Sequence, residues 1–342
     1  MSHFARLLRR AGISFAALLL VLAEPAAGQS YNLAMAGASP GGLWTLLGTG
    51  IHNAIAAAYP GSNIIYQASR GSFANVSLLT QKRVPLALIS NATLRLATSG
   101  AEPFRTPQHG LMALAQLYNF TGVQLVIARD FVERHNVASL ADIADRRLPL
   151  RVGIARRGNI IALTMEMLLR EAGIEAAGLK EWGGDLIHAS VAEQAEMLQE
   201  GRLDMVTTIA FVGHPSVKEL GHLKEVVMLP VPAEIRQRMR RKLGLKDFVL
   251  KGGAYDFMPR DLPTLGLAAT LTAHETLDSR IAYDLTRALI AQIEELRKVH
   301  PAMQELTREL LPSETAIPYH PGAIRAYREA GLMPTPVPRG GR

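Results

Sequence analysis

Four short segments combine glycine, serine, asparagine and arginine in a way that suits the binding of a small anion. They are GASPGG at 37–42, SRGS at 69–72, SN at 90–91 and RRGN at 156–159. Each follows a short apolar run and precedes apolar residues at helical spacing, so each is predicted to be a turn from a strand into a helix. Glycines such as Gly41 and Gly42 let a ligand approach the main chain, and the free N–H groups at a helix start favour negative charge. These turns therefore predict a carboxylate site built largely from backbone.

Two arginines in these turns, Arg70 and Arg157, are candidates to bind the same anion, because a guanidinium can grip a carboxylate through two parallel hydrogen bonds. The alternatives are a solvated loop charge for each arginine and an ordinary tight turn for each glycine pair. Four repetitions of the turn favour a shared site, because ligands bind at the carboxyl ends of the strands in α/β sheets.

Catalytic patterns are missing from the sequence. The ten histidines show no metal-ligand spacing, no G-x-S-x-G segment occurs, and there is no cysteine. GASPGG is not followed by the Lys-Ser/Thr of a phosphate-binding loop. We therefore expect a protein that is not an enzyme, with no catalytic residue, no metal and no cofactor.

Most of the chain alternates strand patterns with helical patterns, which is typical of α/β proteins with largely parallel sheets. Strands are predicted at 31–37, 62–69, 84–90 and 122–130, and the last of these follows a separate extended segment at 104–118. One long helix is predicted over 279–300.

The N-terminus has the pattern of a secretory signal peptide. Arg6, Arg9 and Arg10 precede the apolar run 13–23, and small residues follow at 26–28. The run is too short to cross a bilayer, which takes about 20 residues, so we predict export to the periplasm and cleavage between Gly28 and Gln29. The alternative is a buried N-terminal helix. The net charge of +7 is diffuse, and no basic run is interleaved with aromatics, so we expect no nucleic-acid partner. The run 13–23 is the one uninterrupted apolar run of note in the sequence, so we also expect no membrane span after cleavage.

Taken in order, several longer segments resemble the TAXI family of solute receptors, the periplasmic binding subunits of a class of TRAP transporters. The segments are GASPGGLWTLLG, ASRGSFANVSLL, LALISNA, LYNFTGVQLVIARD, RVGIARRGNI, FVGHPS, GGAYDFMPRDLPTLG and IPYHPGAIRAYREAG. The resemblance covers essentially the whole chain after residue 28. It implies a type II periplasmic-binding-protein fold: two α/β domains joined by two crossings, with the ligand in the cleft between them. It also implies a monomer that binds a small carboxylate, such as glutamate or 2-oxoglutarate, and passes it to membrane permease subunits driven by an ion gradient.

The signal peptide would be residues 1–28. Crossings near Thr121–Gly122 and Leu265–Gly266 would divide the remaining chain into two domains. One domain would hold residues 29–121 and 266–342, and the other residues 122–265.

The resemblance also implies the ligand-binding residues. They are Ser39, Gly41, Gly42 and Trp44 in the first turn, Arg70, Gly71, Ser72 and Asn75 in the second, Ser90 and Asn91 in the third, Arg157, Gly158 and Asn159 in the other domain, and the aromatic residues Tyr118, Phe211 and Tyr255.

This sequence departs from the family pattern in a consistent direction. Trp44 stands where such receptors often have tyrosine, Arg70 and Arg157 add positive charge, and an aspartate usual near Ser90 is missing. An α-ammonium group normally needs a nearby carboxylate, so we expect a di- or keto-acid rather than glutamate.

Two other functions stay open from the sequence. A receptor of the same fold could serve an ATP-driven transporter or a membrane sensor kinase. An enzyme on this fold is the other possibility, although porphobilinogen deaminase, which shares the architecture, needs a cysteine for its cofactor.

Overall fold

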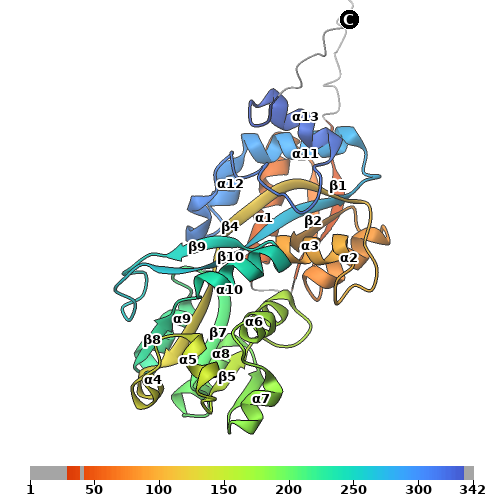
Figure 1. Cartoon of the computed structure of the whole chain (residues 1–342). Coiled ribbons are helices and arrows are strands. Elements are labelled where there is room, and N and C mark those ends of the chain that lie inside the picture. Colours follow the sequence, from red (N-terminus) through yellow and green to blue (C-terminus); the bar gives the residue numbers. More distant parts are fainter. Residues whose placement is uncertain (1–28, 39–41, 335–342) are drawn as a thin grey trace, which may run out of the picture.

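The computed structural model describes residues 29–38 and 42–334 (Figure 1). Its strands form one sheet in the order β2-β1-β3-β10-β4-β7-β5-β6, with β8 on β4 and β9 on β10. The strands are β1 (Asn32–Ala36), β2 (Asn63–Gln67), β3 (Leu86–Ser90), β4 (Leu111–Ala128), β5 (Arg151–Ile154), β6 (Asp185–His188), β7 (Met205–Phe211), β8 (Val226–Leu229), β9 (Lys246–Leu250) and β10 (Leu262–His274).

Helices cover this sheet in two lobes joined by β4 and β10 (Figure 1). In the upper lobe they are α1 (Leu43–Ala58), α2 (Ser72–Thr80), α3 (Asn91–Ser99), α11 (Ser279–Ala291), α12 (Ile293–Arg297), the 3-10 helix η1 (Pro301–Glu305) and α13 (Pro321–Glu329). In the lower lobe they are α4 (Arg129–His135), α5 (Leu140–Asp145), α6 (Ile160–Glu171), α7 (Ala176–Glu181), α8 (Val191–Gln199) and α9 (Pro215–Leu223), with α10 (Ala233–Leu243) lying toward the upper lobe. Within the described residues, none of these helices has the length and apolar character needed to cross a membrane.

Parallel pairing within each lobe sets the direction of the strands. In one lobe β1 is parallel to β2 and β3, and in the other β5 is parallel to β6 and β7. Each of β1, β2, β3, β5, β6 and β7 is followed by a helix, so the helix N-termini gather at the carboxyl edges of the strands. The predicted strand-to-helix turns are confirmed at the ends of β2, β3 and β5.

Strand β4 is longer than the sequence pattern predicts. The extended segment 104–118 and the strand 122–130 were expected as separate pieces, but residues 111–128 form one strand of 18 residues. Its first part pairs with β10, and its last part pairs with β7 and β8. Partners on both sides keep the backbone hydrogen-bonded through the middle of the molecule, which is why the strand continues.

The prediction of one long helix over 279–300 is wrong in one respect, because the helix breaks at Gln292. That residue has φ −109° and ψ 34°, outside the helical range, and separates α11 from α12. Both helices pack on α1, and the break keeps their buried residues, such as Leu289 and Leu296, on the core side.

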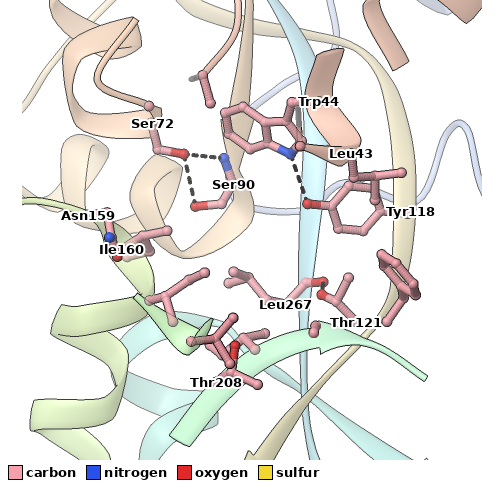
Figure 2. Close-up of a pocket in the computed structure, with 18 of the residues that line it drawn as sticks. Leu43, Trp44, Ser72, Ser90, Tyr118, Thr121, Asn159, Ile160, Thr208 and Leu267 are labelled. Carbon is pink, nitrogen blue, oxygen red and sulfur yellow. Dashed lines mark hydrogen bonds between the residues drawn. The ribbon is translucent and has the colours of Figure 1, made fainter. Parts of the chain in front are cut away.

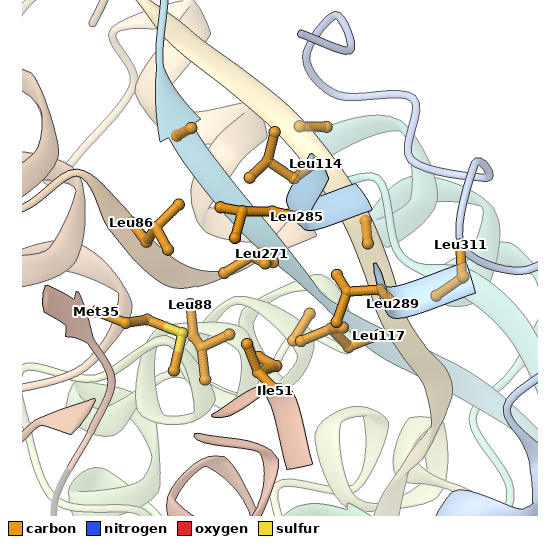
Figure 3. Close-up of a cluster of buried hydrophobic side chains, with 14 of the residues drawn as sticks. Met35, Ile51, Leu86, Leu88, Leu114, Leu117, Leu271, Leu285, Leu289 and Leu311 are labelled. Atoms are coloured by element: carbon orange, nitrogen blue, oxygen red, sulfur yellow. The ribbon is translucent and has the colours of Figure 1, made fainter. Parts of the chain in front are cut away.

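Two hydrophobic cores fill the two lobes. One contains Met35, Leu88, Leu271 and Leu289 (Figure 3), and the other contains buried residues of β5, β7 and α6. Along β4 the core membership changes between Phe120 and Val123. Each lobe therefore has enough buried apolar surface to hold its own helices and turns in place.

Leu88→Ala should lower the free energy of unfolding by about 2–5 kcal/mol, because Leu88 is fully buried at the centre of the first core. The same change at Leu46, which is 38% exposed on α1, serves as the matched control and should cost less than about 1 kcal/mol. Urea denaturation of both variants measures the difference, and equal losses would contradict the assigned core.

Candidate functional site

A cavity of about 520 Å³ lies where the helix N-termini of the two lobes face each other (Figure 2). This volume falls within the range of about 300–1,000 Å³ found for small-molecule sites. Its walls are formed by Ala38, Gly42, Leu43, Trp44, Arg70, Gly71, Ser72, Ser90, Tyr118, Thr121, Asn159, Ile160, Ile161, Val191, Thr208, Ile209, Ala210, Phe211, His214 and Leu267.

Helices α1 and α2 reach the cavity with N-termini that carry no side-chain cap. Their N-cap residues are Gly42 and Gly71, and no side chain of residues 29–38 and 42–334 accepts a hydrogen bond from the first turn of either helix. Gly71 has φ +92°, a backbone conformation that L side chains rarely adopt, so this position needs glycine. The first-turn N–H groups, with the partial positive charge of each helix start, are available to an anion.

Arg70 is the one arginine that lines the cavity, and neither lysine nor any acidic residue lines it within the described residues. Its side chain is exposed, and no carboxylate of the described chain lies within ion-pair distance of it. Its neighbour Gly71 donates its N–H to Ser69 Oγ at 2.9 Å, which fixes the turn. The cavity therefore has a positive side with no internal counter-charge.

Two serines complete this wall beside Arg70. Ser90 N donates to Ser72 Oγ at 2.9 Å, and the two hydroxyl oxygens lie 3.3 Å apart (Figure 2). Ser90 Oγ also caps α3 by accepting from Thr93 N, at 3.3 Å. The Ser72 hydroxyl is the more weakly engaged donor of the pair, so it is the one that a ligand could recruit.

Trp44 and Tyr118 form the next part of the wall. The indole Nε1 of Trp44 donates to the Tyr118 hydroxyl oxygen at 2.9 Å (Figure 2). Burial raises the pKa of Tyr118 to about 12, although the hydrogen bond from Trp44 works in the opposite direction. The phenol is therefore neutral at physiological pH and, having accepted from Trp44, keeps its own O–H to donate.

The opposite wall comes from the other lobe and is different in character. Its helices α6, α8 and α9 are capped by the side chains of Asn159, Ser190 and His214. The residues that these helices and β7 present to the cavity are mainly apolar: Ile160, Ile161, Val191, Ile209, Ala210 and Phe211.

His214 is the titratable group of this second wall. Its Nδ1 accepts from Ser216 N at 3.3 Å, and its ring lies 5.2 Å from that of Phe211. Phe211 in turn contacts the ring of His300, at 4.2 Å between centroids. Burial, followed by the nearby His300, lowers the pKa of His214, so its imidazole is neutral near pH 7.

Most of the residues predicted from sequence line this cavity, five others lie elsewhere in the structure, and two lie outside the described residues. Gly42, Trp44, Arg70, Gly71, Ser72, Ser90, Tyr118, Asn159 and Phe211 line it. Ser39 and Gly41, like the predicted signal peptide at 1–28, lie outside the described residues. Asn75, Asn91, Arg157, Gly158 and Tyr255 are not part of the cavity wall.

Three of those five residues have side chains with hydrogen-bond partners elsewhere in the structure. Asn75 Nδ2 donates to the carbonyls of Gly37 and Leu88, both at 2.7 Å, and so ties β1 to β3. Asn91 Nδ2 donates to Gly244 O, and its Oδ1 accepts from Ala268 N, both at 3.0 Å.

Tyr255, the third, donates to Gln124 Oε1 at 2.8 Å. Arg157 and Gly158, the other two, lie exposed in the turn after β5.

Sequence reasoning missed the apolar half of the cavity. Ile160 and Ile161 directly follow the predicted Asn159, and Val191 follows Ser190, which forms a capping box with Glu193. The S-x-x-E spacing of that box could have located the start of α8. Thr121 and Leu267, which face each other on β4 and β10, gave no signal beyond their place near the predicted crossings.

Metal binding has no support in the described residues, where no group of three or more acidic, histidine or cysteine side chains is arranged to hold an ion.

Comparison with solved structures identifies the class of protein to which this fold belongs. A TctC solute-binding protein from Polaromonas superposes with a TM-score of 0.52 at 15% identity, covering 89% of this chain and 96% of its own. MatC from Rhodopseudomonas palustris, solved with bound malate, gives a TM-score of 0.50 at 14% identity, covering 82% of this chain and 93% of its own. The chain has the two-domain α/β fold of periplasmic binding proteins, which confirms the predicted fold class.

The chain belongs to the NMT1-like family, whose model matches residues 35–331.

Asn75→Ala tests whether this residue acts in the framework or on the ligand. The substitution removes the Asn75 donor from two buried carbonyls, of which Gly37 O keeps a hydrogen bond from Ser69 Oγ, so we expect it to lower the free energy of unfolding by about 1–3 kcal/mol. Asn53→Ala, at an exposed position of α1, should cause no loss in the same urea titration. Full stability with impaired ligand binding would show instead that Asn75 contacts the ligand.

Proposed function

We propose that this protein is the extracytoplasmic solute-binding receptor of an ion-gradient-driven TRAP transporter of the TAXI type. It captures a small carboxylate between its two lobes and delivers it to membrane permease subunits. The signal peptide pattern at residues 1–28 supports export to the periplasm. The ordered segments that resemble TAXI receptors support the choice of transporter class.

The observation that carries the proposal is the positive side of the cavity. Two uncapped helix N-termini, the Arg70 guanidinium and the neutral Tyr118 hydroxyl all offer hydrogen-bond donors there. A carboxylate satisfies such donors with its two oxygens and gains charge-assisted hydrogen bonds. Nothing in the described wall would activate a nucleophile or relay a proton except His214, whose Nδ1 is already used as a helix cap.

An amino acid is a poorer ligand for this cavity than a carboxylate without an amine. No aspartate or glutamate lines the described wall, and Ser39, Pro40 and Gly41, which precede Gly42 in the sequence, are uncharged. An α-ammonium group would therefore lose its hydration without gaining an ion pair. The binding of malate by MatC, a protein of similar fold, is in keeping with a carboxylate ligand.

Closure of the lobes would bury the bound carboxylate. The proposed domains are residues 29–121 with 266–342 and residues 122–265, hinged where Gly122 pairs with Gly266. Ligand contacts to both walls stabilise the closed form by their differential affinity for it. The closed form then presents a surface that the permease recognises.

A thermal-shift screen with Arg70→Gln tests this function. A carboxylate at 100 times its dissociation constant stabilises the protein by about 2.7 kcal/mol, enough to raise its melting temperature measurably. Loss of the charged donor should weaken binding by roughly 10- to 100-fold, while Arg83→Gln, in an exposed turn, should bind like the parent. If no mono- or dicarboxylate raises the melting temperature, or if Arg70→Gln binds as tightly as the parent, the proposed receptor function is wrong.

A further inference from the structure

The two walls of the cavity offer a ligand opposite chemistries. On one wall, the helix starts led by Gly42 and Gly71 are open, and Arg70 has no counter-charge in the described chain. On the other wall, every helix start is closed by a side chain of its own sequence. A ligand that spans the cavity therefore meets a cation and uncapped helix starts at one end, and capped helix starts with the Thr208 hydroxyl and the His214 imidazole at the other.

The cap of α6 is formed by the carboxamide of Asn159. Asn159 Oδ1 accepts from Ala162 N at 2.9 Å, while its Nδ2 donates to Arg156 O at 2.9 Å. Both ends of this carboxamide are used within the turn. The next two side chains, Ile160 and Ile161, then face the cavity.

The cap of α8 places a negative charge at the start of the helix that carries Val191, although that charge does not line the cavity. Glu193 accepts from Ser190 N at 2.7 Å and pairs with Arg156 at 2.6 Å. The hydrogen bonds from Ser190 and the charge of Arg156 hold the pKa of Glu193 at about 2, so it is ionised at neutral pH. Arg156 is thereby neutralised, and the helix start that could have held a second anion already holds a carboxylate.

We propose that the ligand is a monocarboxylate with a branched aliphatic or aromatic body, and not a dicarboxylate. This inference rests on the proposed receptor function and narrows its substrate class. The carboxylate lies at the first turns of α1 and α2 with Arg70, and the body lies against Ile160, Ile161, Val191, Ile209 and Phe211. The expectation of a di- or keto-acid rested partly on two arginines in the site. In the structure Arg70 lines the cavity and Arg157 does not.

The physical reason is the cost of placing a second charge against the apolar wall. A second carboxylate would lose water there and would find neither a cation lining this wall nor an uncapped helix start in the described residues, because the exposed Arg157 does not line the cavity. An apolar body in the same place gains free energy from the area that it removes from water. The two effects act in the same direction, toward an amphipathic ligand.

Calorimetric titration of the purified protein with two sets of acids tests the inference. The first set is 4-methyl-2-oxopentanoate and 3-phenylpropanoate, and the second is succinate, malate and 2-oxoglutarate. We expect at least one acid of the first set to bind ten or more times tighter than every acid of the second. Equal or tighter binding of a dicarboxylate would overturn this inference and leave the receptor function standing, whereas binding of none would contradict the receptor function itself.

Val191→Thr probes the apolar wall directly, because it exchanges a methyl for a hydroxyl at nearly constant shape. It should weaken binding of the first set about tenfold and leave any dicarboxylate binding unchanged. Val249→Thr makes the same change at a site on β9 that is 41% exposed and does not line the cavity, and it should have no effect. An unchanged affinity in Val191→Thr would show that the ligand body does not lie against α8, and the inference would fall.

Discussion

Strands β4 and β10 lie antiparallel and pair from Leu111–His274 at one end to Gly122–Gly266 at the other. Every other strand is placed relative to this pair, because β3 adds to β10 in one lobe and β7 adds to β4 in the other. At the glycine pair there is no room for a side chain, since a Cβ on Gly122 would lie 2.8 Å from Phe248 Cδ1. The pairing thus holds the two halves of the sheet with their strand ends facing, which is the geometry that a shared cavity requires.

Helix capping gives each side of that cavity its character. A side-chain cap satisfies one of the free N–H donors of a helix start, and an uncapped start leaves all of them for a ligand. In this chain the difference follows from single residues: glycine at 42 and 71, and asparagine, serine and histidine at 159, 190 and 214. The same structural unit, a strand followed by a helix, therefore offers open N–H donors in one lobe and an apolar wall in the other.

The sequence was sufficient to predict the fold class and the positions of the turns. Apolar spacing and Gly, Ser and Asn at the strand ends are local signals, and they located Gly71, Ser72 and Asn159 correctly at helix starts. Which polar side chains face the cavity is not a local property. Asn75 lies one helical turn after Ser72 but points toward β1 and β3, and this follows from packing between segments distant in the sequence.

The unpredicted features share a physical cause. The continuity of β4 depends on partners more than 70 residues away, and the break at Gln292 depends on how α11 and α12 fit against α1. Helical periodicity alone cannot reveal either feature, because it reports only which face of a segment is apolar. The apolar wall was missed for the same reason, since isoleucine and valine near a helix start look like ordinary core residues.

A crystal structure of the protein with a bound carboxylic acid would show which wall holds the carboxylate. We expect the carboxylate oxygens within hydrogen-bond distance of first-turn N–H groups of α1 or α2, with the Arg70 guanidinium alongside. A carboxylate found instead at the start of α6, with Asn159 turned away from its cap, would contradict the assignment of the two walls.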